Sequence, residues 1–494
     1  MTQLSWRTIP EMVLSAGDRF GDAEAVVDGS LRLTFGDLVH RVRCAAGAFA
    51  EMGLAKGDRV AVWAPNSAEW IIAAFGLMTA GGVLVPVNTR YRAEEAADII
   101  ARSGAKAVLV QKGFLGQDYT LPLSKPAGHP PIIDLKSGFL TSGSPSVRDG
   151  SDVDGADISE IIFTSGTTGR PKGVLMNHQQ NLRHYVDYSG LLGVREGDRY
   201  LQINPYFHTF GLKAGLLSSC IRGATMFPMP VFDIDRVVEV VAAEQITVLP
   251  GPPTLYHSLL AVEDKAKLST LRVGVTGAAD IPVELIRRVL DELPFQTLAT
   301  GYGLTEGGTA TLSREGDSVE DVATTAGIPM PGVELRIADD GEVLIRGFTV
   351  MQGYLDDPAA TDDTIDPDGW LHTGDLGTLD AANRLRIVGR KKDMFIVGGF
   401  NAYPAEIEGF LMEHPAVAQA AVIGVPDDRL GQVGRAFVVL KNALDPGVTE
   451  AGLEAELIAW SKQRMAGFKV PRSLVFLCAL PLNATGKVMK DQLQ

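Results

Sequence analysis

The chain has 494 residues, of which 46% are hydrophobic and 21% are charged, with a formal net charge of −15. This composition excludes a mostly disordered chain, and the length predicts about two to four folding units at roughly 100–200 residues each. Acidic residues outnumber basic ones by 60 to 45, and no Lys/Arg cluster stands out, which argues against a nucleic-acid partner.

The first third of the chain alternates strand and helix patterns. Short apolar runs are typical of buried strands, and apolar residues at helical spacing lie between them. The expected order is strand, helix, strand, helix, strand, over residues 59–64, 68–80, 83–87, 92–103 and 107–110. This βαβαβ rhythm predicts a mostly parallel sheet that is covered by helices.

The middle of the chain begins with a stretch that has little periodicity. Residues 116–157 are rich in Pro, Gly, Ser and Asp, and we expect a long surface connection there. Buried strands are then predicted over 161–164, 246–250 and 271–276. Pro282 favours the start of a helix, where its missing N–H costs nothing.

Beyond Val333 the pattern changes to short strands separated by Asp/Gly turns, as in an antiparallel region. After about residue 389, strands and two helices predict a small α+β unit. We therefore predict an α/β protein with two domains. Residues 1–390 form a large domain of mostly parallel sheets covered by helices, plus a small β-region, and residues 391–494 form a small α+β domain.

The cysteine spacing and the apolar stretches indicate in which cellular compartment the protein is expected. Cys44, Cys220 and Cys478 are far apart and lack CxxC spacing, so neither a zinc site nor a disulfide framework is indicated, and a reducing cytoplasm is expected. Charges at Arg7 and Glu11 do not fit a signal peptide. The apolar stretch 71–87 is too short for a clean transmembrane helix, so no spanning segment is predicted.

A glycine- and hydroxyl-rich loop follows the strand at 161–164. It reads Ser165-Gly166-Thr167-Thr168-Gly169-Arg170-Pro171-Lys172-Gly173. Glycines let backbone N–H groups converge on an anion, while the hydroxyls and Lys172 add donors and positive charge. Pro171 and the absence of GK[ST] exclude a Walker A loop. The loop therefore predicts a phosphate site, and the alternative, a plain surface turn, is disfavoured by its composition.

With its neighbours, this loop closely resembles the signature of the adenylate-forming superfamily, which comprises acyl-CoA synthetases, luciferases and nonribosomal adenylation domains. Seven blocks occur in the family's order: TSGTTGRPKGV, YFHTFG, TGAA, GYGLTE, GWLHTGD, GRKKDMFIVGGFNAYPAEIE and NATGKVMK. The resemblance implies an ATP-dependent ligase that adenylates a carboxylic acid and then forms a thioester. It also implies ATP, Mg²⁺ and coenzyme A as reactants and cofactor, and a mobile C-terminal domain.

The resemblance assigns roles to single residues. Glu306 would hold Mg²⁺, Thr305 would touch phosphate, Tyr302 would stack on adenine, and Asp375 would bind the ribose hydroxyls with help from Arg390. The alternatives are a hairpin turn with a solvated Glu306, an Asp turn and a surface Arg. The implied nucleotide and coenzyme A contacts are Thr164, Ser165, Gly166, Thr167, Thr168, Gly169, Lys172, Gly277, Ala278, Ala279, Tyr302, Gly303, Thr305, Asp375, Arg390, Gly398, Gly399 and Phe400.

Catalytic roles follow in the same way. Lys487 matches the family's mobile lysine, which stabilises charge at the α-phosphate, and Glu306 and Thr305 complete that group. His208 matches a gate between the acyl pocket and the thiol tunnel, although a lone His in an aromatic run is more often a core residue. Lys392 matches the hinge, and an exposed basic residue is its alternative.

The acid substrate is constrained by charge. The stretch 204–210 has no carboxylate to pair with an α-ammonium, so an acid without an α-amino group is expected. Glycines at 301, 303, 307 and 308 would leave room for a bulky or medium-length acid. Lys213 interrupts an apolar run; we expect it to be solvated, the alternative being contact with a distal keto or carboxylate group.

A closer resemblance is carried by segments 203–215, 248–260 and 468–477. They look like actinobacterial acyl-CoA ligases of steroid-ring degradation that act on the indanedione propanoate. Gly307-Gly308-Thr309 departs from the bulkier, more polar sequence of that subgroup. The alternatives are a ligase that charges a carrier protein and a catalytically silent nucleotide-binding homologue, and a homodimer is compatible with the family.

Overall fold

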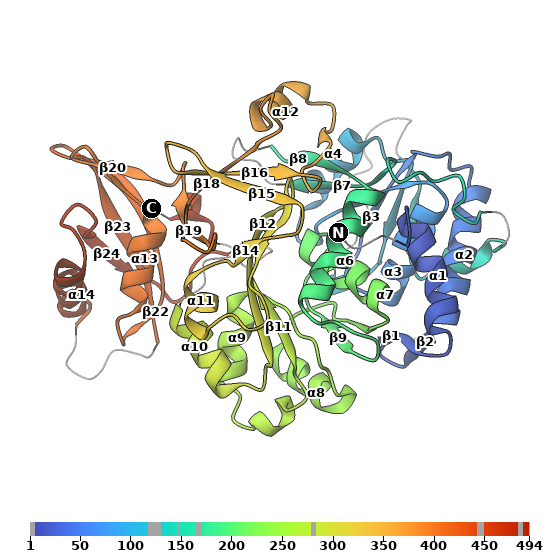
Figure 1. Cartoon of the computed structure of the whole chain (residues 1–494), viewed down its shortest axis with the longest axis horizontal. Helices are drawn as coiled ribbons and strands as arrows, with labels where there is room; N and C mark the ends of the chain where they lie inside the picture. Colours follow the sequence, from blue (N-terminus) through green and yellow to red (C-terminus); the bar gives the residue numbers. More distant parts are fainter. Residues whose placement is uncertain are drawn as a thin grey trace.

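The protein forms a large region and a smaller C-terminal region, on the right and left of Figure 1. The structure is a computed structural model that describes residues 5–116, 130–145, 148–164, 170–277, 283–441, 449–482 and 488–493. The chain passes between the two regions after β19 (Leu385–Arg390). A domain boundary after residue 390 is compatible with this arrangement and stays a prediction.

A seven-stranded sheet forms the centre of the first part of the chain. Its order is β17-β8-β7-β4-β3-β5-β6, and the strands from β7 to β6 run parallel to one another. The predicted βαβαβ unit is therefore present. The strands are β3 (Arg59–Trp63), β4 (Val83–Pro86), β5 (Ala107–Val110), β6 (Ile132–Asp134), β7 (Ile158–Thr164), β8 (Lys172–Asn177) and β17 (Gly353–Tyr354).

Two four-stranded sheets lie beside this one, with the orders β2-β1-β10-β9 and β11-β12-β13-β14. Val248 joins them through parallel bridges to Tyr200 and Val273. The predicted strand over 246–250 is reduced to these two bridges at Val248, and Pro250 has no N–H to donate to a neighbouring strand. The strands are β1 (Glu24–Asp28), β2 (Leu31–Thr34), β9 (Arg199–Gln202), β10 (Thr225–Pro228), β11 (Val273–Thr276), β12 (Thr297–Leu304), β13 (Gly308–Leu312) and β14 (Ile328–Pro329).

The predicted antiparallel region is present as a sheet of order β15-β16-β18-β19. Its other strands are β15 (Val333–Ile337), β16 (Glu342–Gly347) and β18 (Leu371–Leu379). The C-terminal sheet has the order β21-β20-β23-β22, with β24 on β23, and its own apolar core. Its strands are β20 (Phe395–Val397), β21 (Phe400–Ala402), β22 (Val417–Asp427), β23 (Gly431–Leu440) and β24 (Ser473–Phe476).

Helices cover both faces of the large sheets, and polar caps set their starts. Thr34 forms a capping box with Asp37 at the start of α2, and Asn177 does the same with Gln180 at α6. The helices are α1 (Ile9–Phe20), α2 (Phe35–Glu51), α3 (Ala68–Thr79), α4 (Ala93–Ser103), α6 (His178–Leu191), the π-helix η2 (Phe210–Leu217), α7 (Ser218–Arg222), α8 (Ile234–Glu244), α9 (Pro253–Leu260), α10 (Val283–Glu292), α11 (Val319–Thr324), α12 (Pro358–Thr364), α13 (Pro404–Met412) and α14 (Glu450–Arg464). In the described part of the chain, no helix is long and apolar enough to cross a membrane.

The connection predicted over 116–157 is more structured than its composition indicates. It contributes β6 to the large sheet and a short helix, α5 (Phe139–Ser142), that packs on α2. A Cβ at Gly143 would lie 1.9 Å from the backbone nitrogen of Ala48, so only glycine allows this approach. A pattern of apolar residues does not reveal such backbone-to-backbone packing, and the prediction of a surface connection was wrong for these elements.

Candidate active site

Glu306 is the centre of a group of polar side chains contributed by three distant segments. It lies in the tight turn between β12 and β13, and its Oε1 accepts hydrogen bonds from Thr164 Oγ1 at 3.2 Å and from the Tyr354 hydroxyl at 3.1 Å. Lys172 Nζ lies 4.9 Å from the centre of the Tyr354 ring. The hairpin turn named as the alternative for Glu306 is present, but the carboxylate is half-buried and accepts hydrogen bonds from two hydroxyls.

Tyr354 was missed by sequence reasoning. It enters this group from β17, the edge strand that pairs with β8. Burial, with the nearby charge of Glu306, raises the pKa of the Tyr354 hydroxyl, so it stays protonated and able to donate. The dipeptide Gly353-Tyr354 carries no local signal for this role, because the contact depends on how the edge strand is added to the sheet.

A second group joins Tyr302, Asp375 and Arg390. The Tyr302 hydroxyl donates to Asp375 Oδ2 at 2.7 Å, and Arg390 Nε lies 3.0 Å from Asp375 Oδ1. Asp375 and Arg390 face each other across the antiparallel pair β18 and β19, which explains their contact. Burial, reinforced by the charge of Asp375, raises the pKa of Tyr302 well above its usual value, so the phenol remains a donor.

The core of the predicted phosphate loop, Ser165, Gly166, Thr167, Thr168 and Gly169, lies outside the described residues, as do Ala278, Ala279 and Lys487. The flanks of the loop are described: Thr164 ends β7 and Lys172 begins β8 on the adjacent antiparallel strand. Both side chains belong to the Glu306 group. The loop between them therefore starts and ends beside that carboxylate.

The donor set around Glu306 fits a magnesium ion. Mg²⁺ is usually bound by one or two carboxylates together with substrate phosphates and waters, so one carboxylate beside a phosphate loop suffices. Among the described residues, no group of three or more His, Cys, Asp or Glu side chains could hold a metal alone. A site shared with a phosphate ligand is therefore the arrangement that these residues support.

Two of the predicted contact glycines are needed for backbone packing. A Cβ on Gly303 would lie 2.3 Å from the Gly308 carbonyl across the hairpin, and one on Gly277 would lie 2.9 Å from the Gly301 carbonyl. Both contacts are shorter than a real Cβ tolerates. These glycines thus allow β12 to lie close to its neighbours, which keeps Tyr302 and Glu306 in place whether or not a ligand touches them.

His208 lies at the start of the π-helix η2. Its Nδ1 accepts a hydrogen bond from the Phe210 backbone at 3.2 Å, and its own backbone N–H donates to the Pro205 carbonyl. The side chain is half-buried, and π-helical turns recur at functional sites. The gate role of His208 stays a prediction.

Two parts of the small region bear on the predicted contacts. Gly398 and Gly399 have φ of +57° and +89° in the β20–β21 turn, and the exposed Phe400 stacks on Phe468 with ring centres 5.1 Å apart. Near the end of the chain, Lys490 pairs with Glu408 of α13 at 2.7 Å. The coenzyme A contacts at 398–400 and the mobility of the small region stay predictions.

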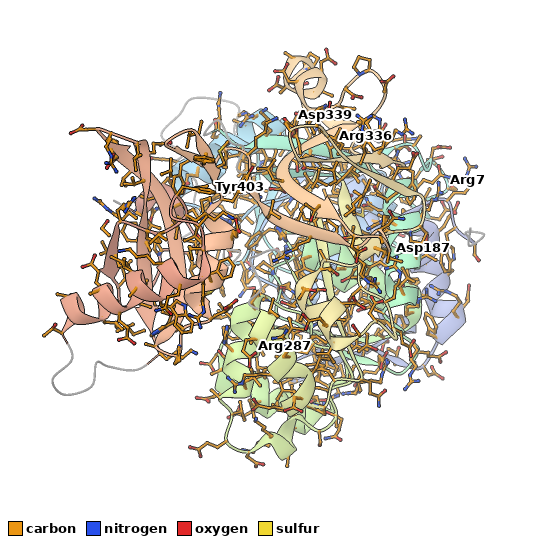
Figure 2. All side chains as sticks on the ribbon, turned by 60° about the vertical axis from the view of Figure 1, so that its left-hand side comes forward. Arg7, Asp187, Arg287, Arg336, Asp339 and Tyr403 are labelled. Atoms are coloured by element: carbon orange, nitrogen blue, oxygen red, sulfur yellow. The ribbon has the colours of Figure 1, made fainter. Side chains whose placement is uncertain are left out.

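Helix α13 faces the large region. It packs against β19, and a Cβ on Gly389 would lie 3.7 Å from Cβ of Tyr403. Figure 2 shows Tyr403 at the junction of the two regions. Leu482 and Val488, on either side of residues 483–487, which the structure does not describe, form an antiparallel bridge. The described chain end is therefore on the side of α13, the helix that contacts the strand carrying Arg390.

The two lysines at the junction of the two regions, Lys391 and Lys392, differ in their contacts. Lys391 pairs with Asp340 at 2.6 Å and with Glu342 at 3.3 Å, so this position is tied to the large region. Lys392 is exposed, and its hinge role stays a prediction.

Lys213 is not solvated, contrary to expectation. Its side chain is 2% exposed, and its Nζ lies 2.6 Å from Glu160 Oε1. Glu160 is therefore a second residue that sequence reasoning missed. The run around Lys213 forms the buried π-helix, and a buried ammonium requires an opposite charge, here supplied by β7.

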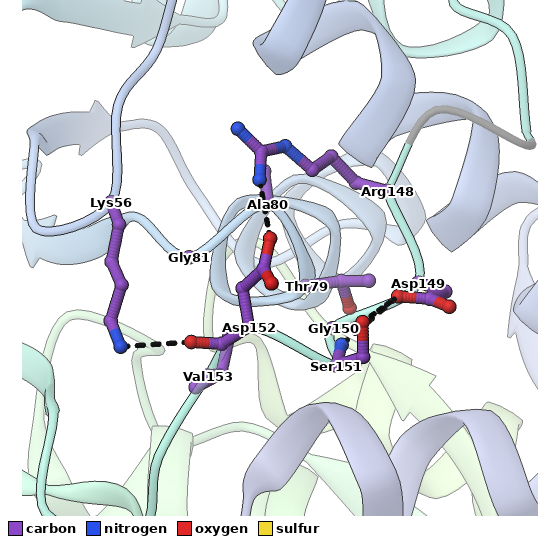
Figure 3. Close-up of a pocket in the computed structure, with 10 residues that line it drawn as sticks. All are labelled: Lys56, Thr79, Ala80, Gly81, Arg148, Asp149, Gly150, Ser151, Asp152 and Val153. Carbon is purple, nitrogen blue, oxygen red and sulfur yellow. Dashed lines mark hydrogen bonds and ion pairs between the residues drawn. The ribbon is translucent and has the colours of Figure 1, made fainter.

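A separate pocket of about 190 Å³ lies near the start of the chain's first large sheet, between the loop 148–153 and the end of α3. It is lined mainly by the loop 148–153 together with Lys56 and the end of α3, and Figure 3 shows Lys56 and Arg148 bonded to Asp152. It shares no residue with the groups around Glu306 and Asp375. Its polar side chains satisfy one another, so it has no chemistry to add.

Comparison with known proteins decides the family. The model of the AMP-binding enzyme family matches residues 14–355, and that of the AMP-binding enzyme C-terminal domain matches residues 406–487. The chain belongs to the AMP-binding enzyme family. The resemblance to the adenylate-forming superfamily is thereby confirmed.

Individual relatives of this AMP-binding enzyme are similar over almost their whole length. A ligase of Rhodococcus jostii named 3-[(3aS,4S,7aS)-7a-methyl-1,5-dioxo-octahydro-1H-inden-4-yl]propanoyl:CoA ligase is 47% identical over 99% of this chain and 98% of its own. A ligase of the same name from Mycobacterium tuberculosis is 45% identical, again over 99% and 98%. The structure of ATP-bound MatB from Rhodopseudomonas palustris has a TM-score of 0.88 at 28% identity, covering 98% and 97%.

These similarities confirm the predicted fold class and the closer resemblance to indanedione propanoate ligases. The protein is an acyl-CoA ligase of the AMP-binding enzyme family, and ATP, Mg²⁺ and coenzyme A are the reactants and cofactor of that activity. The roles of the individual site residues stay predictions.

The Tyr302–Asp375 hydrogen bond provides a direct test of the ribose site. In Tyr302→Phe the ring remains for stacking, but Asp375 loses its phenol donor. We expect the KM for ATP to rise about tenfold, roughly 1.4 kcal/mol, with little change in the KM for the acid. Initial rates of pyrophosphate release at varied ATP would measure this, and an unchanged KM for ATP would contradict the assignment.

Proposed function

We propose that this acyl-CoA ligase activates the indanedione propanoate, a fused bicyclic acid with two ring ketones and a propanoate side chain. The observation that carries the proposal is the similarity to two ligases named for this acid, at 47% and 45% identity over 99% of the chain. Medium-chain acids are the second candidate, because the residues at 307–309 depart from the expected subgroup sequence.

The charges beside the aromatic block, residues 206–210, support an acid without an α-amino group. Glu160 is the carboxylate that approaches this block from β7, and Lys213 neutralises it at 2.6 Å. Asn204 is also engaged, because its Nδ2 donates to the Pro250 carbonyl at 3.0 Å. An ammonium on the substrate would therefore compete with Lys213 for one carboxylate, at a high desolvation cost.

The reaction assigns a task to each group. A carboxylate oxygen of the acid attacks the α-phosphorus, and the bond to pyrophosphate breaks. The loop after Thr164 and Lys172 would hold the phosphates, Asp375 the ribose, and Lys487 the charge that develops at phosphorus. Mg²⁺, when bound at Glu306, supplies compensation for the phosphate charge.

The second step then uses the same acyl carbon. The thiolate of coenzyme A attacks this carbon and the bond to AMP breaks. Because the two steps need different groups at one carbon, rotation of the small region would exchange Lys487 for the surface at 398–400.

A substrate panel would test the acid. Pyrophosphate release and thioester formation would be measured with ATP, Mg²⁺ and coenzyme A for the indanedione propanoate, its ring-deoxygenated analogue, octanoate, an aryl propanoate and an α-amino acid. We expect the highest kcat/KM with the indanedione propanoate and no turnover of the amino acid. Preference for the deoxygenated analogue would indicate recognition of ring size alone, and preference for octanoate would favour the second candidate.

The location and assembly of the ligase are also proposals. Cys44 and Cys220 are buried free thiols, which supports a reducing compartment such as the cytoplasm. Fractionation of cells that express the protein would test this. A homodimer stays a prediction, and the mass of the purified ligase in solution would decide it.

A further inference from the structure

Glu160 of β7 and Lys213 of η2 form a buried ion pair. Both side chains are almost completely buried, at 1% and 2% exposure, and their charged atoms are 2.6 Å apart. Asn181 Nδ2 donates to both oxygens of Glu160, at 3.0 and 2.9 Å, and the Ser159 hydroxyl also donates to this carboxylate. The carboxylate is thus fully engaged by groups from β7, α6 and η2.

Stability alone does not explain such a pair. Removing two ions from water costs several kcal/mol each, and apolar replacements of similar volume are often neutral or stabilising. The helix around Lys213 is apolar, because its neighbours Leu212, Ala214 and Leu216 belong to the main hydrophobic core. A methionine at position 213 would suit that core, so the charges are better explained by the arrangement that they impose.

The arrangement links residues of the phosphate side and the acyl side. Glu160 is four residues before Thr164 on the same strand, so both side chains leave the same face of β7. Lys213 is in the π-helix that begins two residues after His208, and the His208 carbonyl accepts hydrogen bonds from the backbone of Gly211 and Leu212. One ion pair therefore connects the strand that ends at the Glu306 group with the helix that follows the aromatic block.

Helix α6 extends the connection to the hairpin of Glu306. Asn181 and His184 are one turn apart on this helix, and His184 Nε2 accepts a hydrogen bond from the Thr309 backbone at 3.2 Å. Burial, together with the charge of Lys213, lowers the pKa of His184 to about 3. The ring therefore stays neutral at working pH and keeps an acceptor for the backbone just after Glu306.

We infer that Glu160 and Lys213 are positioning residues for the adenylation step. Their ion pair, with Asn181 and His184, holds η2 and the 306–309 hairpin in register with β7. The acid, which lies against the aromatic block, is thereby kept in line with the α-phosphate. Neither residue touches the reacting atoms, so loss of the pair should affect the acid and its alignment more than ATP binding.

The test is a double-variant cycle on the full-length ligase. Lys213→Met, Glu160→Gln and the double variant Glu160→Gln/Lys213→Met would be compared by thermal unfolding and by pyrophosphate-release kinetics. We expect the double variant to unfold within a few degrees of the wild type, yet to lose at least tenfold in kcat/KM for the acid, with the KM for ATP unchanged. Lys213→Arg, which keeps the charge, should recover part of that loss.

The outcomes separate the alternatives. Wild-type kinetics in a folded double variant would overturn the inference. So would a rise in the KM for ATP as large as the loss of kcat/KM for the acid. If the double variant fails to fold, Glu160→Gln alone decides by the same criterion, because its amide oxygen still accepts from Lys213. Lys265→Met is the matched control, since it breaks a half-exposed pair with Glu292 at 2.6 Å and should change nothing.

The inference rests on the ligase activity and not on the identity of the acid. The assays use whichever acid the wild-type enzyme adenylates fastest. A wrong acid in the substrate proposal would appear as a slow wild-type enzyme on the panel, whereas failure of the positioning role would appear only as unchanged kinetics of the variants.

Discussion

Replacing Lys487 by alanine is expected to slow adenylation on the order of 10²–10³-fold, or roughly 2.7–4 kcal/mol, and to leave thioester formation from supplied acyl-adenylate largely intact. The reason is that the ammonium compensates charge only while the α-phosphate is attacked. Pyrophosphate release measures the first step, and coenzyme A consumption with synthetic adenylate measures the second.

Measuring both half-reactions distinguishes a specific loss of adenylation from a general defect of the small region. A general defect of the small region would slow both of them, and an equal loss in both would refute the exchange of surfaces proposed for this region. Lys462→Ala is a suitable control, because Lys462 is an exposed lysine in the last turn of α14. It should leave both rates unchanged.

Glu306→Gln is expected to reduce the adenylation rate by roughly 10²-fold or more, or about 3 kcal/mol. The amide keeps the shape and the hydrogen bonds from Thr164 and Tyr354, but it loses the charge that suits Mg²⁺. The KM for the acid should change little. Initial rates at increasing Mg²⁺ would show a higher half-saturating concentration in the variant.

Tyr354→Phe is the control that separates the charge of Glu306 from its hydrogen bond to the Tyr354 phenol. Tyr354→Phe removes one hydrogen bond to Glu306 Oε1 but leaves the carboxylate, so we expect less than a tenfold loss of rate. Wild-type rates for Glu306→Gln at ordinary Mg²⁺ would contradict the metal assignment. A larger loss in Tyr354→Phe than in Glu306→Gln would assign the main role to the phenol.

Much of the fold could be predicted because its elements follow local patterns. The parallel unit from β3 to β5 was predicted from apolar runs alternating with helical spacing. The predictions failed where packing between distant segments decides the structure. The connection over 116–157 contains β6 and α5, and the strand over 246–250 is reduced to two bridges at Val248.

The candidate site shows the same division. Glu306, Asp375, Arg390 and Thr164 could be singled out from motifs, and the structure brings them into two hydrogen-bonded groups. Tyr354 and Glu160 could not, because neither belongs to a recognisable motif. The expectation for Lys213 was wrong because the polarity of its side chain was considered without the partner that β7 supplies.

The amino-acid sequence by itself determined the order of the motifs, the alternation of strands and helices, and the chemistry available at each position, since these depend on residues close together in the chain. Only the tertiary structure decided which distant groups meet: Tyr354 with Glu306, Tyr302 with Asp375, and Lys213 with Glu160. These contacts join residues 48, 73 and 53 positions apart. They depend on strand order, register and the burial of charge, which are properties of the assembled sheets and of no single segment.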